Sequence, residues 1–224
     1  NYKKISKFKK KFWVNMKINE FQKRLISSTI LIPLSLICIY EGSVLFNFFL
    51  ILCLVVSIFE WKKISNKKNI FILGFLFLIF SFFTAYLIRN SFESNGLFIF
   101  LFLIIICISS DLGGYIFGKI FKGPKLTKIS PNKTYSGVLG SFFLSGILTT
   151  YFVYYIEHLK ITMLELNLNL LIIIFFFSFI SQAGDLIVSY FKRKANLEDT
   201  GNLIPGHGGI LDRIDGIIFV IPTF

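Results

Sequence analysis

Charged residues and cysteines are scarce in this chain of 224 residues, and the sequence has no internal repeat. Only 16% of the residues are charged, whereas 54% are hydrophobic and 29 are phenylalanine, and the mean hydropathy is +0.72. This hydropathy is too high for a soluble globular protein, and the composition also excludes collagen-like, disordered and disulfide-framework proteins. Cys38, Cys53 and Cys107 lie in apolar runs without metal-ligand spacing, so we interpret them as small hydrophobic residues.

Acidic residues are outnumbered by basic ones, 12 against 24, which gives a net charge of +12. In a soluble protein this excess would suggest binding to nucleic acid. Here the basic residues lie between long apolar runs, and this placement indicates anionic lipid and phosphate as partners, with no nucleic acid.

Six runs without a charged residue predict six complete membrane-spanning helices in an all-α protein. The runs are 16 to 23 residues long, close to the roughly 20 apolar residues that a spanning helix needs. They comprise residues 25–40, 42–59, 69–88, 94–110, 134–156 and 166–184. Pro33 in the shortest run can be accommodated by tilt or by local thinning of the bilayer. A seventh run, 216–224, is too short to span, so we expect a truncated seventh helix.

The basic residues gather in alternate connections between these runs. Arg89 and Lys160 lie elsewhere, and the other 22 basic residues lie in residues 1–24, 62–68, 119–133 and 192–213. By the positive-inside rule this partition predicts a cytoplasmic N-terminus and cytoplasmic basic loops. We divide the chain into three parts: a basic N-terminal segment (1–24), N-terminal transmembrane helices (25–104) and a catalytic transmembrane region with cytoplasmic loops (105–224).

One face of the sixth predicted helix is polar. Ser178, Ser181, Asp185, Ser189 and Lys192 are spaced by three or four positions, which places them on a single helix face. An acid at a membrane is costly unless it is paired, hydrated or bound to a metal, so Asp185 is a candidate functional residue near the cytoplasmic interface. The alternative is a structural polar stripe that holds helices together.

A segment rich in acids and glycines follows this helix. Asp212 and Asp215 share a helix face, and together with Asp185 they offer the oxygen ligands that Mg²⁺ prefers. Glycines at 201, 206, 208 and 209 allow the backbone to approach a ligand closely. His207 either binds a phosphate by a hydrogen bond or stabilises the turn, and a zinc site would need more His or Cys residues nearby.

The connection before the fifth apolar run is basic and contains helix-start signals. Ser130 followed by Pro131 predicts an N-cap and a helix that begins at residue 131. A helix N-terminus beside Lys133 and Thr134 would suit a phosphate. The lysines in this connection either only set the orientation of the chain in the membrane or act as functional groups. We favour the first interpretation for Lys122 and the second for Lys133. Upstream, Ser110, Gly114 and Gly118 form a small-residue face suited to close helix packing.

These motifs resemble those of the CDP-diacylglycerol synthases, or phosphatidate cytidylyltransferases. The C-terminal residues that match the family are Ser181, Gln182, Gly184, Asp185, Leu186, Ser189, Lys192, Arg193, Asp199, Gly201, Ile204, Pro205, His207, Gly208, Gly209, Asp212, Arg213 and Asp215. Upstream matches are Ser110, Asp111, Gly114, Tyr115, Gly118, Lys125, Leu126, Ser130, Pro131, Lys133, Thr134 and Gly137. Two positions depart from the family pattern: Glu198 replaces a lysine, and Ser136 replaces a glutamate.

The resemblance implies that CTP and phosphatidate react to give CDP-diacylglycerol and pyrophosphate. It also implies an all-helical homodimer in the membrane, with Mg²⁺ held by Asp185 and Asp212 and a K⁺ ion beside it. The implied location is the bacterial inner membrane, with the active site facing the cytoplasm. The rival readings are a related CTP-dependent lipid or polyprenol kinase and a phosphate-binding transporter, although a transporter should have a midplane site or inverted halves.

We therefore predict the following roles. The catalytic residues are Asp185, Asp212, Lys133, Lys192 and Arg213, and Asp215 is a further candidate metal ligand. The substrate- or phosphate-binding residues are Lys125, Ser130, Thr134, Ser189, Arg193, His207, Gly208 and Gly209. Because the phosphate of phosphatidate is already an oxyanion, no protein nucleophile or general base is required, and the protein mainly positions the substrates and neutralises charge.

Overall fold

The computed structural model describes residues 20–91, 95–127, 130, 133–158, 167–206 and 208–224. The basic segment up to residue 19, Pro131 and His207 lie outside the described residues. Six helices are long and apolar enough to cross a membrane, which confirms the six predicted spans. They are α2 (Glu20–Glu41), α3 (Ser43–Ile64), α4 (Lys68–Ser91), α5 (Asn95–Phe121), α6 (Tyr135–His158) and α7 (Leu168–Lys194). The described part of the chain contains no strand, only two isolated β-bridges.

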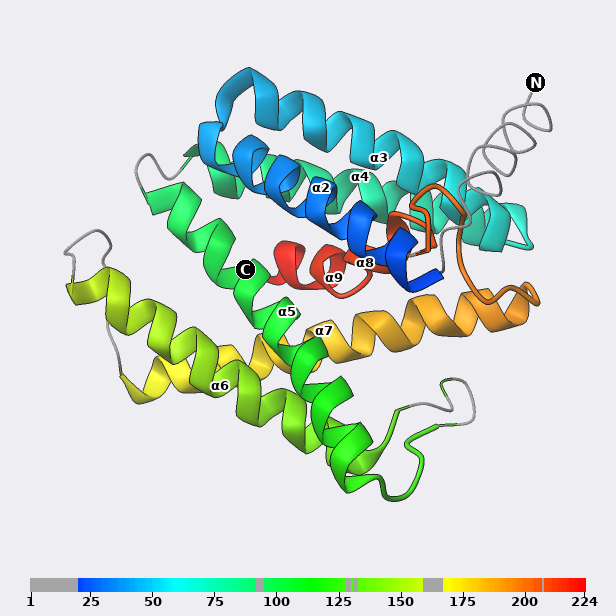
Figure 1. The fold of residues 1–224 in the computed structure, drawn as a ribbon. Coiled ribbons are helices and arrows are strands. Elements are labelled where there is room, and N and C mark those ends of the chain that lie inside the picture. Colours follow the sequence, from blue (N-terminus) through cyan, green and yellow to red (C-terminus); the bar gives the residue numbers. More distant parts are fainter. Residues whose placement is uncertain (1–19, 92–94, 128–129, 131–132, 159–166, 207) are drawn as a thin grey trace.

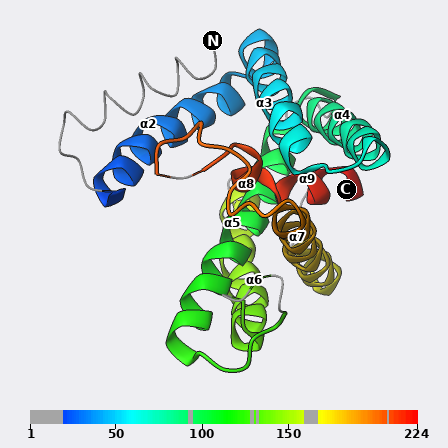
Figure 2. The same cartoon turned by 90° about the vertical axis from the view of Figure 1, so that its right-hand side faces the viewer.

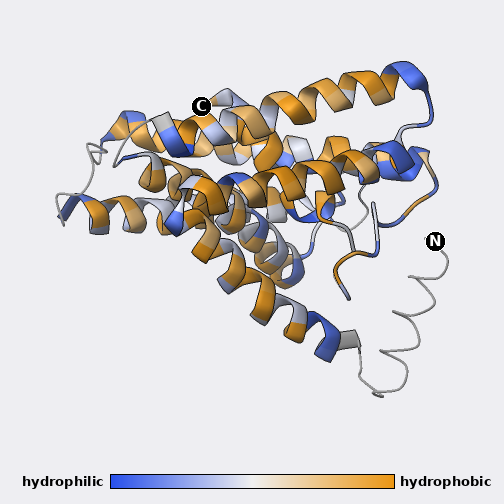
Figure 3. Ribbon diagram, turned by 90° about the horizontal axis from the view of Figure 1, so that it is seen from above, coloured by the Kyte–Doolittle hydropathy of each residue, from blue (hydrophilic) through white to orange (hydrophobic). Residues whose placement is uncertain are grey.

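The helices are hydrophobic along their length and hydrophilic at their ends and in several connections (Figure 3). Helix α2 continues through Pro33, as expected from the sequence. Helix α7 begins at a capping residue, Asn167, whose side chain accepts a hydrogen bond from the backbone N–H of Leu170 at 2.8 Å. Helices α5 and α7 extend beyond their apolar runs, and this extension carries the polar residues of the site on rigid elements.

The predicted seventh helix is present as a broken helical segment. It consists of α8 (Leu211–Ile214), α9 (Ile217–Val220) and a short 3-10 helix (Ile221–Thr223). In Figure 1 this segment, coloured red, lies among the long helices rather than outside them. Its side chains Leu211 and Val220 are fully buried, so the segment forms part of the hydrophobic core.

Helices α5 and α6 pack with their backbones almost in contact. A Cβ atom added at Gly137 would lie 2.8 Å from the carbonyl oxygen of Gly114, and one added at Gly113 would overlap the carbonyl of Gly140. Ser141 Oγ donates a hydrogen bond of 2.7 Å to the carbonyl of Ser110 across the same crossing. The predicted small-residue face is therefore confirmed, and Figure 2 shows the two helices side by side.

The start of α6 differs from the prediction. The helix begins at Tyr135, and its N-cap is Thr134, whose Oγ1 accepts a hydrogen bond of 3.1 Å from the N–H of Gly137. The predicted N-cap at Ser130 is wrong, because the residues just before the helix pair with the first part of the same connection, a few residues after the end of α5. Lys125 and Thr134 form an antiparallel bridge, and the N–H of Leu126 donates to the carbonyl of Lys133 at 2.8 Å.

Hydrogen bonds bring several basic connections to one end of the helices. Asn66 Nδ2, between α3 and α4, donates to the carbonyl of Lys194 at the end of α7 at 3.0 Å. Near the start of α2, Arg24 Nε donates to the carbonyl of Gly206 at 2.8 Å, and Ser27 Oγ donates to that of Pro205 at 3.1 Å. The glycine-rich segment after α7 is thus held by the first part of α2.

Candidate active site

The polar face of α7 lies inside the molecule, as its spacing predicted. Ser178 and Ser181 are fully buried, and Ser178 Oγ donates a hydrogen bond of 3.1 Å to Ser110 Oγ on α5. Asp185, Ser189 and Lys192 continue this face toward the end of the helix. The helix therefore carries its charged groups from a buried serine contact to the end where the basic connections meet.

Asp185 forms an ion pair with Lys133. Lys133 Nζ lies 2.5 Å from Asp185 Oδ2, and it also lies 3.4 Å from the carbonyl of Gln182, one turn earlier in α7. Both side chains are about one quarter exposed, 25% for Lys133 and 26% for Asp185. Ser189 Oγ lies 3.5 Å from Asp185 Oδ1, at the outer limit of hydrogen-bond distance.

Asp212 forms a second ion pair, with Lys192. The Nζ–Oδ1 distance is 2.8 Å, and the two side chains are only 12% and 5% exposed. The other oxygen, Oδ2, accepts hydrogen bonds from the N–H of Thr200 at 2.9 Å and from the N–H of Gly209 at 3.0 Å, and Thr200 Oγ1 lies 3.0 Å from it. Asp212 is therefore fixed by backbone groups that the glycine-rich segment presents.

The two ion pairs belong to one charged cluster. Lys192 interacts electrostatically with Asp185 and Asp215 as well as pairing with Asp212. Asp215 is 8% exposed and shares a hydrogen bond with Asp185. Burial raises the pKa of Asp215 well above its usual value, and the negative charge of Asp185 raises this pKa further. Asp215 therefore holds a proton more readily than an ordinary aspartate does.

The other predicted site residues lie around this cluster or have local partners. Arg213 is exposed and interacts electrostatically with Asp111. Arg193 is exposed, and its Nη1 lies 3.4 Å from the carbonyl of Leu197. Lys125 is exposed in the bridge to Thr134, whose hydroxyl oxygen caps α6.

Three further predicted phosphate contacts have backbone roles in the structure. The carbonyl of Ser130 accepts a hydrogen bond of 3.1 Å from the N–H of Lys133. Gly208 has a φ of +89°, a conformation that favours glycine, and Gly209 donates its N–H to Asp212. Contacts of these residues with phosphate remain predictions.

Two acids near the cluster were not assigned a role from the sequence. Asp111 on α5 interacts electrostatically with Asp185, Lys133 and Arg213. Glu60, near the end of α3, is 2% exposed and accepts hydrogen bonds from residues 200–211. The sequence signal for Glu60 was an acid at the end of an apolar run, just before the basic pair Lys62 and Lys63.

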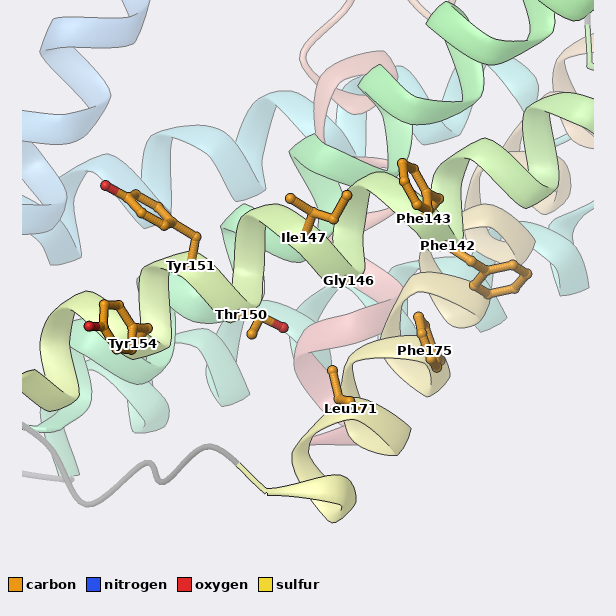
Figure 4. A pocket seen from close by; sticks show the side chains of 9 residues that line it. All are labelled: Phe142, Phe143, Gly146, Ile147, Thr150, Tyr151, Tyr154, Leu171 and Phe175. Atoms are coloured by element: carbon orange, nitrogen blue, oxygen red, sulfur yellow. The ribbon is translucent and has the colours of Figure 1, made fainter.

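A separate apolar groove lies between α6 and α7, with a volume of about 600 Å³ (Figure 4). Its lining consists almost entirely of aromatic and aliphatic side chains: Phe142, Phe143, Gly146, Ile147, Thr150, Tyr151, Tyr154, Leu171 and Phe175. None of the predicted site residues lines it. Its chemistry suits hydrocarbon rather than a nucleotide.

Comparison with known sequences decides the family. The sequence model of the cytidylyltransferase family matches residues 69–224, which include the charged cluster and the glycine-rich segment. The chain belongs to the cytidylyltransferase family. Proteins named phosphatidate cytidylyltransferase from Rickettsia typhi and Rickettsia prowazekii are each 36% identical to it over 206 residues, covering 90% of this chain and 89% of each relative. One from Staphylococcus aureus strain COL is 39% identical over 131 residues, covering 58% of this chain and 48% of that protein. The family resemblance inferred from the motifs is thereby confirmed.

Proposed function

We propose that this membrane protein transfers the cytidylyl group of CTP to phosphatidate, giving CDP-diacylglycerol and pyrophosphate. The observation that carries the proposal is the similarity, over nine tenths of the chain, to relatives that bear the name of this activity. The structure supports it with a cluster of lysines and aspartates on membrane helices, where a charged nucleotide and a lipid headgroup can meet.

In the proposed reaction, an oxygen of the phosphatidate phosphate attacks the α-phosphorus of CTP. A new P–O bond forms, the bond between the α- and β-phosphates breaks, and pyrophosphate leaves with the electron pair. The nucleophile is already an anion, so no side chain has to remove a proton. Lys133 and Lys192 are suited to contact the phosphates, because each ammonium group is fixed by an aspartate of the cluster. Arg213 is a further candidate for this role.

We propose Mg²⁺ as the cofactor, held by Asp185 and Asp212, with K⁺ beside it. The donor chemistry fits Mg²⁺, because both groups are carboxylates that lie near the shared Lys192. Among the described residues no three His, Cys, Asp or Glu side chains are arranged to hold a metal by themselves. Mg²⁺ is usually bound through one or two carboxylates plus substrate phosphates. When bound, the ion would neutralise phosphate charge.

The test uses purified protein with CTP, phosphatidate and Mg²⁺, and lipid products are identified by mass spectrometry. CDP-diacylglycerol together with released pyrophosphate is expected. A CTP-dependent lipid kinase would instead give CDP and a newly phosphorylated lipid, and a transporter would give no new lipid. Either of these outcomes would contradict the proposal. Omission of Mg²⁺ or addition of EDTA is expected to abolish product formation.

We also propose that the basic connections face the cytoplasm of the bacterial inner membrane, where CTP is available. The support is the partition of 22 of the 24 basic residues into alternate connections. A single cysteine placed at Asn66 or Asn132, in a variant in which the three native cysteines are replaced, should not react with an impermeant reagent added to intact cells. Strong external labelling at either position would refute this orientation.

The oligomeric state is a further part of the proposal. We expect the homodimer that the family resemblance implies. Light scattering of the protein in nanodiscs, corrected for lipid, measures this directly, and a mass of one chain would contradict it.

A further inference from the structure

Glu60 is a buried carboxylate that joins the first half of the chain to the glycine-rich segment. It lies in the last turns of α3 and is only 2% exposed. Its Oε2 accepts hydrogen bonds from the N–H of Leu211 at 2.8 Å and from Thr200 Oγ1 at 2.9 Å, and its Oε1 accepts one from the N–H of Ile210 at 3.1 Å. These contacts fix both ends of the segment from residue 200 to residue 211.

The surroundings of Glu60 are shaped to receive its carboxylate. A Cβ atom at Gly201 would lie 2.5 Å from Oε1, and one at Gly209 would overlap both Oε2 and Thr200 Oγ1. Among the described residues, no lysine or arginine lies within ion-pair distance of Glu60. Backbone N–H groups and one hydroxyl group therefore stabilise the charge of Glu60. They do so only while the backbone of the glycine-rich segment keeps the conformation seen in this structure.

The glycine-rich segment also holds Asp212. Successive backbone N–H groups divide between the two acids: that of Gly209 donates to Asp212, whereas those of Ile210 and Leu211 donate to Glu60. Thr200 Oγ1 lies 2.9 Å from Glu60 Oε2 and 3.0 Å from Asp212 Oδ2, but it has a single proton to donate. The two carboxylates are thus coupled through one hydroxyl and one turn of backbone.

We propose that Glu60 is a positioning residue for Asp212. It keeps Thr200 and Gly209 in the positions from which their N–H groups hydrogen-bond Asp212 Oδ2, and it thereby leaves Oδ1 to Lys192 and the charged cluster. This inference rests on the proposed function in one respect, namely that Asp212 is a metal ligand. It does not depend on which substrate the enzyme uses.

The test compares the full chain in nanodiscs with Glu60→Gln, Thr200→Val and Thr200→Ser variants. Glutamine keeps the size of the side chain but places an NH₂ donor against the N–H and O–H donors that now face a carboxylate. Glu41→Gln is the matched control, because Glu41 is an exposed acid at the end of α2. Two properties are measured: affinity for Mn²⁺, used in place of Mg²⁺ and followed by electron paramagnetic resonance, and amide hydrogen exchange in the peptide covering residues 208–213.

We expect Glu60→Gln to weaken Mn²⁺ binding by about 10–100-fold, the usual effect of losing a group that orients a metal ligand, and to accelerate exchange in this peptide. Thr200→Val should also weaken Mn²⁺ binding, whereas Thr200→Ser, which keeps the hydroxyl group, should bind Mn²⁺ as the wild type does. Glu41→Gln should change neither Mn²⁺ affinity nor hydrogen exchange. Mn²⁺ affinity within twofold of the wild type in Glu60→Gln would overturn the inference, as would a wild-type protein that binds no Mn²⁺. If Glu60→Gln does not fold, the comparison of Thr200→Val with Thr200→Ser decides.

These measurements separate the inference from the proposed function. A wild-type protein that makes no CDP-diacylglycerol but binds Mn²⁺, and loses that binding in Glu60→Gln, contradicts the proposed reaction and supports the role of Glu60. Normal CDP-diacylglycerol synthesis by the wild-type protein, together with unchanged Mn²⁺ affinity in Glu60→Gln, supports the proposed reaction and contradicts the role of Glu60.

Discussion

The two ion pairs of the charged cluster are built in different ways. Asp185 belongs to the long helix α7, and its partner Lys133 reaches it from the connection that precedes α6. Asp212 follows the glycine-rich segment, which surrounds one carboxylate oxygen with three donors and leaves the other to Lys192. The first pair is about one quarter exposed, and the second is almost enclosed. One acid is thus positioned by the helix that carries it, and the other by the backbone folded around it.

The largest effect is expected when either acid loses its charge. Asn is nearly isosteric with Asp, so Asp185→Asn and Asp212→Asn should insert and fold while activity falls by about 10²–10⁴, as expected for losing a metal ligand or a large electrostatic contribution. The double variant should lose little more than either single one, because one missing ligand already empties the site. Turnover at increasing Mg²⁺ concentrations measures these effects.

Asp215, the third acid of the cluster, provides a matched comparison for Asp185. Asp215 shares a hydrogen bond with Asp185 and has a raised pKa, so Asp215→Asn resembles its protonated form and should retain more activity than Asp185→Asn. Near-normal turnover of folded Asp212→Asn with an unchanged Mg²⁺ requirement would remove the basis of the proposed mechanism.

Substitution of the two lysines tests the difference between the partly exposed Lys133–Asp185 pair and the enclosed Lys192–Asp212 pair. Lys133→Met and Lys192→Met should each lower activity by about 10²–10³, because each removes a cation from the proposed phosphate site. Their effects on stability should differ. Breaking an enclosed pair costs up to about 3–5 kcal/mol of unfolding free energy, against about 1 kcal/mol for a pair open to solvent. Thermal unfolding in detergent should show the larger decrease for Lys192→Met, and the reverse order would contradict our description of the pairs.

A glycine substitution should disturb only the Asp212 pair. A Cβ atom at Gly209 would overlap Glu60 and Thr200, so Gly209→Ala should displace the donors of Asp212 and lower activity by about 10–100-fold. Gly146→Ala is the control: there a Cβ would lie 3.3 Å from an edge atom of the Phe175 ring, and alanine favours the helix. Activity assays of both variants in parallel measure the difference. Equal losses of activity in the two variants would mean that the backbone conformation of the glycine-rich segment is unimportant for activity.

The smallest effect is expected for Glu198→Lys. Glu198 is exposed and stands where the family has a lysine, while Ser136 removes an acid from another position. If these departures compensate each other, restoring the lysine should change activity by less than about tenfold, or 1.4 kcal/mol of barrier. Turnover of the single variant at saturating CTP measures this. A rise of a hundredfold or more would show instead that the native chain is a weakened enzyme.

Local patterns of the sequence were sufficient to predict much of the fold and part of the site. The lengths of the uncharged runs predicted all six spanning helices, and a spacing of three to four residues placed Asp185 and Lys192 on one face of α7. The small-residue face at Ser110 and Gly114 predicted the close crossing with α6. Each of these features depends on the periodicity of one helix, which can be read within about 20 residues.

Features that depend on distant partners could not be predicted in the same way. Glu60 is separated from Leu211 by 151 positions, and nothing near Glu60 in the sequence indicates which N–H groups it meets. The helix start at Tyr135 was missed for a similar reason. Ser130 and Pro131 have the local form of a cap, but the pairing of Lys125 with Thr134 places the cap four residues later.

The contact between Glu60 and the glycine-rich segment also sets an order of assembly during synthesis. A ribosome releases α3 long before residues 200–211, because Thr200 follows Glu60 by 140 positions. Until then, Glu60 has to remain hydrated at the membrane surface or find temporary partners. Asp212 enters its final surroundings only after all six spanning helices have been synthesised. The nascent enzyme therefore completes its charged centre as one of its last folding events, and ribosome-bound chains ending before Thr200 would lack the Lys192–Asp212 pair while already containing Lys133 and Asp185.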